Sequence, residues 1–307
     1  MRIVFFGTPA FAVASLQALL RERFTVAGVV TQPDKPQGRS RSALVSSPVK
    51  IAAQAEGLPV LQPVRPVGDV FSAGLRRLEP DLGVVVAYGH ILRPEILEIP
   101  GRGMINVHAS LLPRYRGAAP IQHAILEGET ETGVTIMQME RGLDSGPILH
   151  RAVTPIGADD TAGTLAARLS ELGAAALIET LSLFSGGLAR PQVQDESRAT
   201  YAPKLDREMA RLDWRHDAST LARKVRAFDP APGAWTMLNG NVLKLFGARE
   251  APGAGQPGEV LAAGDRLVIA AGSGAITVGE VQPAGKTRLP VEAWVRGRGV
   301  STGQRLE

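Results

Sequence analysis

The chain opens on a short apolar run, a turn, a helical pattern and a second apolar run. Arg2–Phe6 predicts a buried strand, and Phe11–Arg23 places its apolar residues at nearly helical spacing. Thr25–Thr31 is again apolar and β-branched, which favours a strand. A strand, the turn at Gly7-Thr8-Pro9, a helix and a strand are the usual beginning of a doubly wound α/β domain.

The same alternation continues to about residue 183. Leu82–Ala87 and Met104–His108 are almost wholly apolar, which predicts central parallel strands because both of their faces are covered. Two helices and two alternating strands are predicted over Pro120–Glu127, Thr161–Leu183, Thr132–Glu140 and Ile148–Val153. We therefore expect a doubly wound, Rossmann-like catalytic domain over residues 1–189, with Thr161 as the N-cap of its last helix.

The pattern changes beyond residue 189. Residues 190–204 are rich in polar residues and proline, show little periodicity, and are interpreted as a linker. A helix is predicted at about Ala218–Ala227, and several short strands separated by glycine-rich turns follow it. Asn239-Gly240 is a strong hairpin signal. For residues 205–307 we expect a small antiparallel β-barrel of the oligonucleotide-binding (OB-like) type.

One stretch of the N-terminal half does not fit the regular pattern. Residues 32–48 are rich in proline, glycine and serine and carry Lys35, Arg39 and Arg41. Most connections between a strand and a helix in such folds take about 2–6 residues. A loop of this length in a compact domain is usually either functional or disordered.

Composition restricts the possible chemistry. The chain has 307 residues, of which 44% are hydrophobic and 21% charged, as in a folded protein of two domains. It contains no cysteine, which excludes thiolate nucleophiles, cysteine-ligated zinc and iron–sulfur clusters and fits a reducing cytoplasm. The net charge of +4 lies mainly in the C-terminal part, with +1 over residues 1–190 and +3 over 191–307. This distribution favours an anionic partner for the C-terminal part.

Three polar residues stand out as candidate catalytic groups. Alternation along the strand places Asn106 and His108 on the same side, at the carboxyl end that faces the ligand crevice in doubly wound sheets. Asp144 lies between Gly142 and Gly146, where the backbone can approach a ligand closely. A histidine at a strand end and an aspartate in a glycine-rich turn are also common as purely structural residues. The pattern alone leaves both interpretations open.

Recognisable motifs are spread over nearly the whole chain. They are GTPAFA (7–12), QPDKPQGR (32–39), SPVK (47–50), VVVAYGHIL (84–92), INVHASLLPRYRGAAPIQHAI (105–125), ETGVTIMQME (131–140), GLDSGPIL (142–149), VQDESRATYAPKL (193–205) and RAFDPAPGAW (226–235). Together they resemble the methionyl-tRNA formyltransferase family. The central block, from Asn106 to Asp144, resembles enzymes that use 10-formyltetrahydrofolate in general.

The resemblance implies a reaction and a set of residues. A formyl group would pass from 10-formyltetrahydrofolate to the α-amino group of methionyl initiator tRNA in the cytoplasm, with no metal and no covalent enzyme intermediate. Asn106 would stabilise the oxyanion, and His108 and Asp144 would handle the proton, without a decision on which of the two moves it. Folate contacts are implied at Ser110, Leu111, Leu112, Pro113, Tyr88 and Gly89. Nothing demands an oligomer, and we expect a monomer.

The resemblance also implies that the 32–50 loop contacts the acceptor end of the tRNA, through Arg39 and Arg41. The loop departs from the family pattern, with one basic residue fewer and one extra position. Further candidate phosphate contacts in the C-terminal part are Arg223, Lys224, Arg226, Lys244, Lys286 and Arg288.

Two alternative functions remain open at this point. A sugar-nucleotide N-formyltransferase would share the three catalytic residues but would need neither the basic loop nor a basic C-terminal domain. A non-catalytic nucleic-acid-binding protein on an enzyme scaffold would bind no folate, and the intact set of Asn106, His108 and Asp144 argues against it.

Overall fold

The computed structural model describes residues 1–37 and 43–307. The chain forms two compact units. The first consists of residues 1–120, 131–155 and 166–203, and the second of residues 121–130, 156–165 and 204–307. Each unit is described by itself.

The first unit is built on a seven-stranded sheet with the order β10-β9-β7-β6-β1-β2-β5. Its strands are β1 (Arg2–Gly7), β2 (Thr25–Val30), β5 (Val60–Leu61), β6 (Leu82–Val86), β7 (Met104–His108), β9 (Glu131–Gln138) and β10 (Ile148–Pro155). The chain starts at β1 in the middle, moves outward through β2 to β5, and then returns to β6 and β7, all in parallel. Strand β9 pairs antiparallel to β7, and β10 pairs antiparallel to β9. The predicted doubly wound α/β fold is confirmed.

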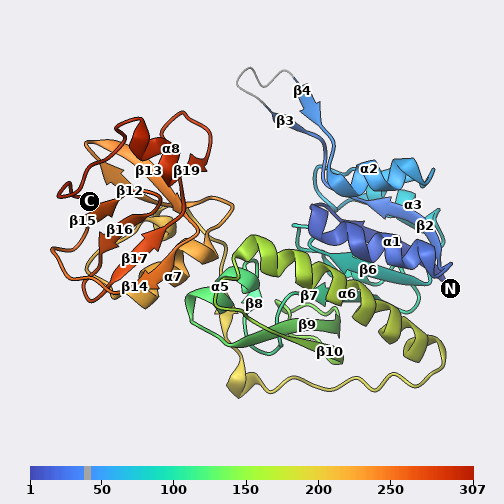
Figure 1. Ribbon diagram of the computed structural model, residues 1–307. Helices are drawn as coiled ribbons and strands as arrows, with labels where there is room; N and C mark the ends of the chain where they lie inside the picture. The colour runs from blue at the N-terminus through green and yellow to red at the C-terminus, as the bar shows by residue number, and fades with distance from the viewer. Residues whose placement is uncertain (38–42) are drawn as a thin grey trace. The chain divides into compact units, whose positions relative to one another are not determined.

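Helices follow most of the parallel strands (Figure 1). In the first unit they are η1 (Ala10–Ala12), α1 (Val13–Arg21), α2 (Pro48–Ala55), α3 (Asp69–Arg76), α4 (Pro94–Leu97) and most of α6 (Ala162–Ser185). Helix α5 (Pro120–Leu126) also comes after β7 in the chain, but from residue 121 on it belongs to the second unit. Helix α1 buries Leu16 and Leu19 completely, which explains its apolar spacing. Thr161 accepts a hydrogen bond from the backbone N–H of Thr164 at 3.2 Å, so the predicted N-cap of α6 is confirmed.

The stretch predicted as a long loop contains two short strands. β3 (Lys35–Gln37) pairs in antiparallel register with β4 (Ala43–Val45), so the expectation of a loop over the whole stretch is wrong there. Figure 1 shows this ribbon extending from the first unit. Arg39 and Arg41 lie outside the described residues. Helix α2 follows directly, with Ser47 as its N-cap and Pro48 at its first position.

The core explains why the central strands carry no polar alternation. Every residue of β6 is buried, and Phe5 and Phe6 of β1 are fully inaccessible to solvent. Covered on both faces, these strands gain hydrophobic free energy on each side.

The segment after α6 packs against the first unit. The backbone of Gln192 forms a bridge with Ile148 of β10, and β11 (Tyr201–Ala202) pairs in parallel with β8 (Arg116–Gly117). The segment also holds η2 (Glu196–Arg198). Residues 190–204, interpreted from the sequence as a linker, thus supply strand pairing to the first unit as far as residue 203.

The second unit is built on antiparallel strands, as predicted. One sheet has the order β12-β13-β18-β19 and the other β14-β17-β16-β15. The strands are β12 (Ala234–Leu238), β13 (Asn241–Phe246), β14 (Arg249–Ala251), β15 (Val260–Ala263), β16 (Leu267–Ala270), β17 (Ala275–Val278), β18 (Glu280–Pro283) and β19 (Leu289–Pro290). The helices of residues 204–307 are η3 (Glu208–Ala210), α7 (Ala218–Ala227) and α8 (Val291–Arg296). Asn239 and Gly240 both have positive φ, 50° and 73°, and join β12 to β13 in the two-residue turn that the sequence predicts.

The close approach of β9 and β10 gives a first testable prediction. A Cβ atom at Gly133 would lie 2.1 Å from the carbonyl oxygen of Ala152 and 2.6 Å from Cδ2 of Leu111. We therefore expect Gly133→Ala to lower the free energy of unfolding by about 2–3 kcal/mol, because the backbone of β10 must move. Urea unfolding followed by circular dichroism measures this loss.

Gly101→Ala is the matched control for this substitution. No heavy atom lies within 4 Å of a Cβ built at Gly101. An equal urea midpoint for the two variants would show that the strands can separate without cost, contrary to the prediction.

Candidate active site

Two of the predicted catalytic side chains meet at the carboxyl end of β7. Nδ1 of His108 lies 3.6 Å from Oδ2 of Asp144, and their side chains are only 6% and 16% exposed. Asn106 lies two residues before His108, and strand alternation places it on the same face of the sheet. It is half-buried, and within the described part of the chain its side chain makes no hydrogen bond. The amide of Asn106 is therefore available to a ligand.

The surroundings of His108 define where its proton lies. Its Nε2 is 3.0 Å from the carbonyl oxygen of Tyr115. Because a carbonyl can only accept, Nε2 is the protonated nitrogen, and in the neutral ring Nδ1 carries the lone pair. That lone pair faces the carboxylate of Asp144. A proton that reaches Nδ1 therefore enters a position between the imidazole and the carboxylate.

The backbone holds Asp144 in place from two sides. Its Oδ2 accepts a hydrogen bond of 2.8 Å from the backbone N–H of Gly117. Asp144 itself has φ of 49°, in the left-handed region that few residues other than glycine, asparagine and aspartate adopt. Two residues later, a Cβ at Gly146 would lie 1.9 Å from the carbonyl oxygen of Gln138, so the turn needs glycine there. Oδ1 has no hydrogen-bond partner among the described residues and is free to accept from a ligand.

The loop predicted to contact folate is fixed by the antiparallel strands beside it. Ser110 is fully buried, and its hydroxyl donates to the carbonyl of Arg114 at 2.6 Å. The hydroxyl of Thr135, on β9, donates to the carbonyl of Ser110 and accepts from the N–H of Leu112. Arg151, on β10, donates to the carbonyl of Leu112 at 2.9 Å. These contacts fix the backbone of Ser110, Leu111, Leu112 and Pro113 directly after His108.

Tyr88 and Gly89 follow β6, the strand next to β7. The Tyr88 side chain is 2% exposed and packs edge-to-face on Phe6, with ring centroids 5.4 Å apart. Burial raises the pKa of Tyr88 to about 12, so its phenol stays protonated. Thr8 and Gln32 donate to its carbonyl, and Gly89 turns the chain with φ of 85°. Tyr88 thus belongs to the core, and its contribution to a site is to position the loop that begins at Gly89.

A cavity that the sequence did not indicate lies in the first unit. It has a volume of about 600 Å³, within the range of small-molecule sites. Its lining residues are Pro94, Leu97, Glu98, Pro100, Gly101, Gly103, Met139, Glu140 and Arg141. Residues 139–141 belong to the same loop as Asp144. Its lining combines the hydrophobic side chains of Leu97 and Met139 with the charged residues Glu98, Glu140 and Arg141.

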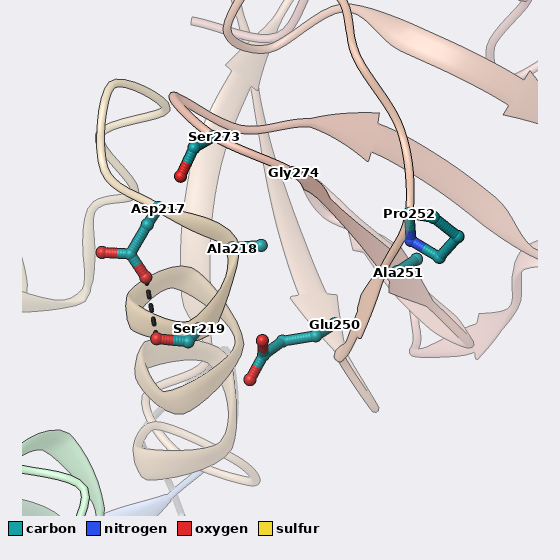
Figure 2. Close-up of a pocket in the computed structure, with 8 residues that line it drawn as sticks. All are labelled: Asp217, Ala218, Ser219, Glu250, Ala251, Pro252, Ser273 and Gly274. Atoms are coloured by element: carbon teal, nitrogen blue, oxygen red, sulfur yellow. Dashed lines mark hydrogen bonds between the residues drawn. The ribbon is translucent and has the colours of Figure 1, made fainter.

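The second unit also contains a cavity, of about 520 Å³, which Figure 2 shows. Two carboxylates, of Asp217 and Glu250, line it (Figure 2). The Asp217 carboxylate caps α7 by accepting from the N–H of Thr220 and from the hydroxyls of Ser219 and Thr220. These hydrogen bonds, above all that from the backbone of Thr220, hold the pKa of Asp217 well below its usual range. An acidic cavity of this kind does not suit a phosphate.

Several predicted phosphate contacts of the second unit are bound internally. Arg288 forms ion pairs with Asp229 and Glu280. Arg226 donates to the carbonyl of Asp160, Arg223 to that of Leu126, and Lys244 to that of Pro232. Burial lowers the pKa of Lys224. Lys286 is exposed. Most of these cations therefore form contacts within the second unit, and Lys286 remains on its surface.

Other kinds of site are not indicated in the described residues. No group of three or more histidine, cysteine, aspartate or glutamate side chains in residues 1–37 and 43–307 could hold a metal ion. Within the same residues, no helix combines the length and the apolar character needed to cross a membrane.

Comparison with known proteins places this geometry in a family. Residues 1–181 match the family described as "Formyl transferase", and residues 204–299 match the family described as "Formyl transferase, C-terminal domain". The methionyl-tRNA formyltransferase of Magnetococcus marinus is 50% identical over 306 residues, which are 99% of this chain and 98% of that protein. The methionyl-tRNA formyltransferase of Thiobacillus denitrificans is 49% identical over 310 residues, with 100% and 99% covered.

A solved structure agrees with the assignment. HypX from Aquifex aeolicus, in its complex with tetrahydrofolic acid, is 25% identical and superposes with a TM-score of 0.66 over 97% of this chain. The match covers 47% of HypX, so this chain spans about half the length of that protein. With both of its parts matched and close relatives covered from end to end, the chain belongs to the formyl transferase family.

Proposed function

We propose that this protein transfers the formyl group of 10-formyltetrahydrofolate to the α-amino group of methionyl initiator tRNA. The observation that carries the proposal is the convergence of Asn106, His108 and Asp144 at the carboxyl end of β7. The full-length similarity to proteins named methionyl-tRNA formyltransferase supports this choice of acceptor. The sugar N-formyltransferases among the similar solved structures are less alike, at 17–20% identity, so a sugar-nucleotide acceptor is less supported.

The geometry suits acyl transfer without a covalent enzyme intermediate. The neutral α-amino nitrogen forms a bond to the formyl carbon, and the bond from that carbon to the folate nitrogen breaks. One proton leaves the attacking amine, and one arrives at the departing folate nitrogen. Asn106 donates its free amide N–H to the oxygen that becomes negative. Oδ1 of Asp144 accepts from the amine, and His108 holds a proton at Nδ1 against Oδ2.

We also propose where the donor binds. We assign it to the loop of Ser110, Leu111, Leu112 and Pro113, to the turn at Tyr88 and Gly89, and to the 600 Å³ cavity that ends at residues 139–141. The backbone of the loop is held by Thr135 and Arg151, so it can present its carbonyl and N–H groups without reorganising. Because the acceptor is a charged tRNA used in translation initiation, we propose that the protein acts in the cytoplasm. We also propose that it acts as a monomer.

A direct assay tests the function. Purified protein is incubated with 10-formyltetrahydrofolate and with initiator tRNA charged with methionine, beside a charged elongator tRNA. Rapid formylation that favours the initiator supports the proposal. Absence of formylation, with tetrahydrofolate still bound, would reject the tRNA acceptor and direct the search to an amino sugar nucleotide.

The basic residues of the 32–50 segment provide a second test of the acceptor. We expect the double substitution Arg39→Ala/Arg41→Ala to lower kcat/KM for methionyl initiator tRNA about 10-fold, because two phosphate contacts are lost. The affinity for the folate donor should stay the same. Steady-state formylation at two salt concentrations measures the loss, which should shrink at high salt.

Arg76→Ala/Arg77→Ala is the matched control, since both of these arginines are exposed near the end of α3. If kcat/KM for the tRNA is unchanged by the substitutions at 39 and 41, these two arginines do not contact the acceptor.

A further inference from the structure

Gln194 connects the segment after α6 to the turn that presents Asp144. Its side chain is 5% exposed, and its Nε2 donates to two backbone carbonyls, those of Asp144 and Gly146, each at 2.8 Å. These carbonyls lie on either side of Ser145. The amide therefore spans the turn in which Asp144 has its left-handed conformation.

The other end of the Gln194 amide is also fully used. Its Oε1 accepts from Nε and Nη2 of Arg116, at 3.1 and 2.7 Å. A primary amide has two N–H donors and two acceptor positions, and all four are occupied here. The two ends differ in chemistry, because the carbonyls can only accept and the guanidinium can only donate. The orientation of the amide is thereby fixed.

Arg116 connects this arrangement to the Asp144 carboxylate by a second route. It is 2% exposed and forms two hydrogen bonds to the carboxylate of Glu196, which raise the pKa of Arg116 and lower that of Glu196. A buried guanidinium without such partners would be strongly destabilising. The next residue is Gly117, whose N–H binds Oδ2 of Asp144. The carboxylate is thus held through Gly117 and its backbone through Gln194.

We propose that Gln194 is a positioning residue for formyl transfer. By binding both carbonyls of the turn, its amide keeps Oδ2 of Asp144 opposite Nδ1 of His108 and leaves Oδ1 directed to the substrate. Without those two hydrogen bonds the carbonyls lose their buried partners, and the left-handed turn relaxes to another conformation. The inference rests on the proposed function, because formyl transfer is its main readout.

Gln194→Glu tests this role sharply. A carboxylate can still accept both hydrogen bonds from Arg116, but it cannot donate to the carbonyls of Asp144 and Gly146 and adds a negative charge beside Arg116. We expect kcat for formylation to fall about 100-fold, as for a catalytic group displaced by about 1 Å. KM for the tRNA and for the donor should change less than about threefold, because the turn acts on the chemical step.

Gln192→Glu is the matched control. It makes the same chemical change two positions earlier, where the side chain is exposed. Its kcat is expected to equal that of the unmodified protein. A kcat for Gln194→Glu within about twofold of that for Gln192→Glu would overturn the proposal, as would a rise in KM with kcat unchanged.

A second variant and a second readout keep the test decisive. If Gln194→Glu does not fold, Gln194→Asn withdraws the amide by one methylene, and full kcat in that variant would equally overturn the proposal. Amide hydrogen exchange over residues 139–147 is measured without substrates. Faster exchange in Gln194→Glu, and not in Gln192→Glu, supports the positioning role even if the unmodified protein formylates no tRNA, an outcome that would reject the proposed function alone.

Discussion

Replacing Asp144 with asparagine is expected to lower kcat for formyl transfer about 1000-fold while tRNA binding persists. The asparagine side chain has the same shape and can still accept from the N–H of Gly117, so the turn keeps its fold. What it lacks is the negative charge beside Nδ1 of His108. Neither the proton of the amine nor a proton at Nδ1 is then stabilised. Single-turnover formylation, with the enzyme in saturating excess over the charged tRNA, isolates this step from binding.

Asp69→Asn serves as the control, since Asp69 is an exposed residue at the start of α3. It removes the same charge from the same unit and should leave kcat unchanged. Turnover near normal in Asp144→Asn would remove the carboxylate from the mechanism.

His108→Gln is expected to reduce kcat by a similar factor of about 1000. A glutamine can place an N–H where Nε2 of the histidine stands and keep the hydrogen bond to the carbonyl of Tyr115. It has no nitrogen lone pair to take up a proton opposite Asp144. The variant therefore retains the structural contact and loses only the proton position. Its thermal midpoint should stay within about 3 °C of that of the unmodified protein.

The exposed His216 provides the matched substitution, His216→Gln, for which full activity is expected. Combining His108→Gln with Asp144→Asn should cost little more than either change alone, because residues that act as a unit are strongly non-additive. Fully multiplied losses in the double variant would mean that the two side chains work in separate steps.

The sequence predicted the features that depend on local pattern. The apolar run of β6 and the Asn239-Gly240 turn follow from rules that act over a few residues, and both are found where they were expected. The same is true of the carboxyl end of β7 as the position of Asn106 and His108, because alternation and parallel topology together define that edge.

Long-range partners could not be predicted in this way. Gln194 lies in a stretch without periodicity, and its hydrogen bonds reach Arg116, 78 residues earlier. Arg288 is a basic residue that the pattern assigns to the surface, and its ion pair with Asp229 spans 59 positions. Pairing at such separations depends on the completed fold. The protonated nitrogen of His108 is likewise decided by the backbone carbonyl of Tyr115, a contact that the sequence pattern does not indicate.

The pairing of β11 with β8 has a consequence for dividing the protein into independent halves. A chain cut at residue 189 would keep Asn106, His108 and Asp144 and lose Gln194 and the whole of β11. Such a fragment would keep the hydrogen bond from Gly117 to the Asp144 carboxylate but lose the two that hold the backbone of the turn. A cut after residue 203 would retain these supports. The supports of the carboxylate turn therefore extend about fourteen residues beyond the boundary that composition suggests.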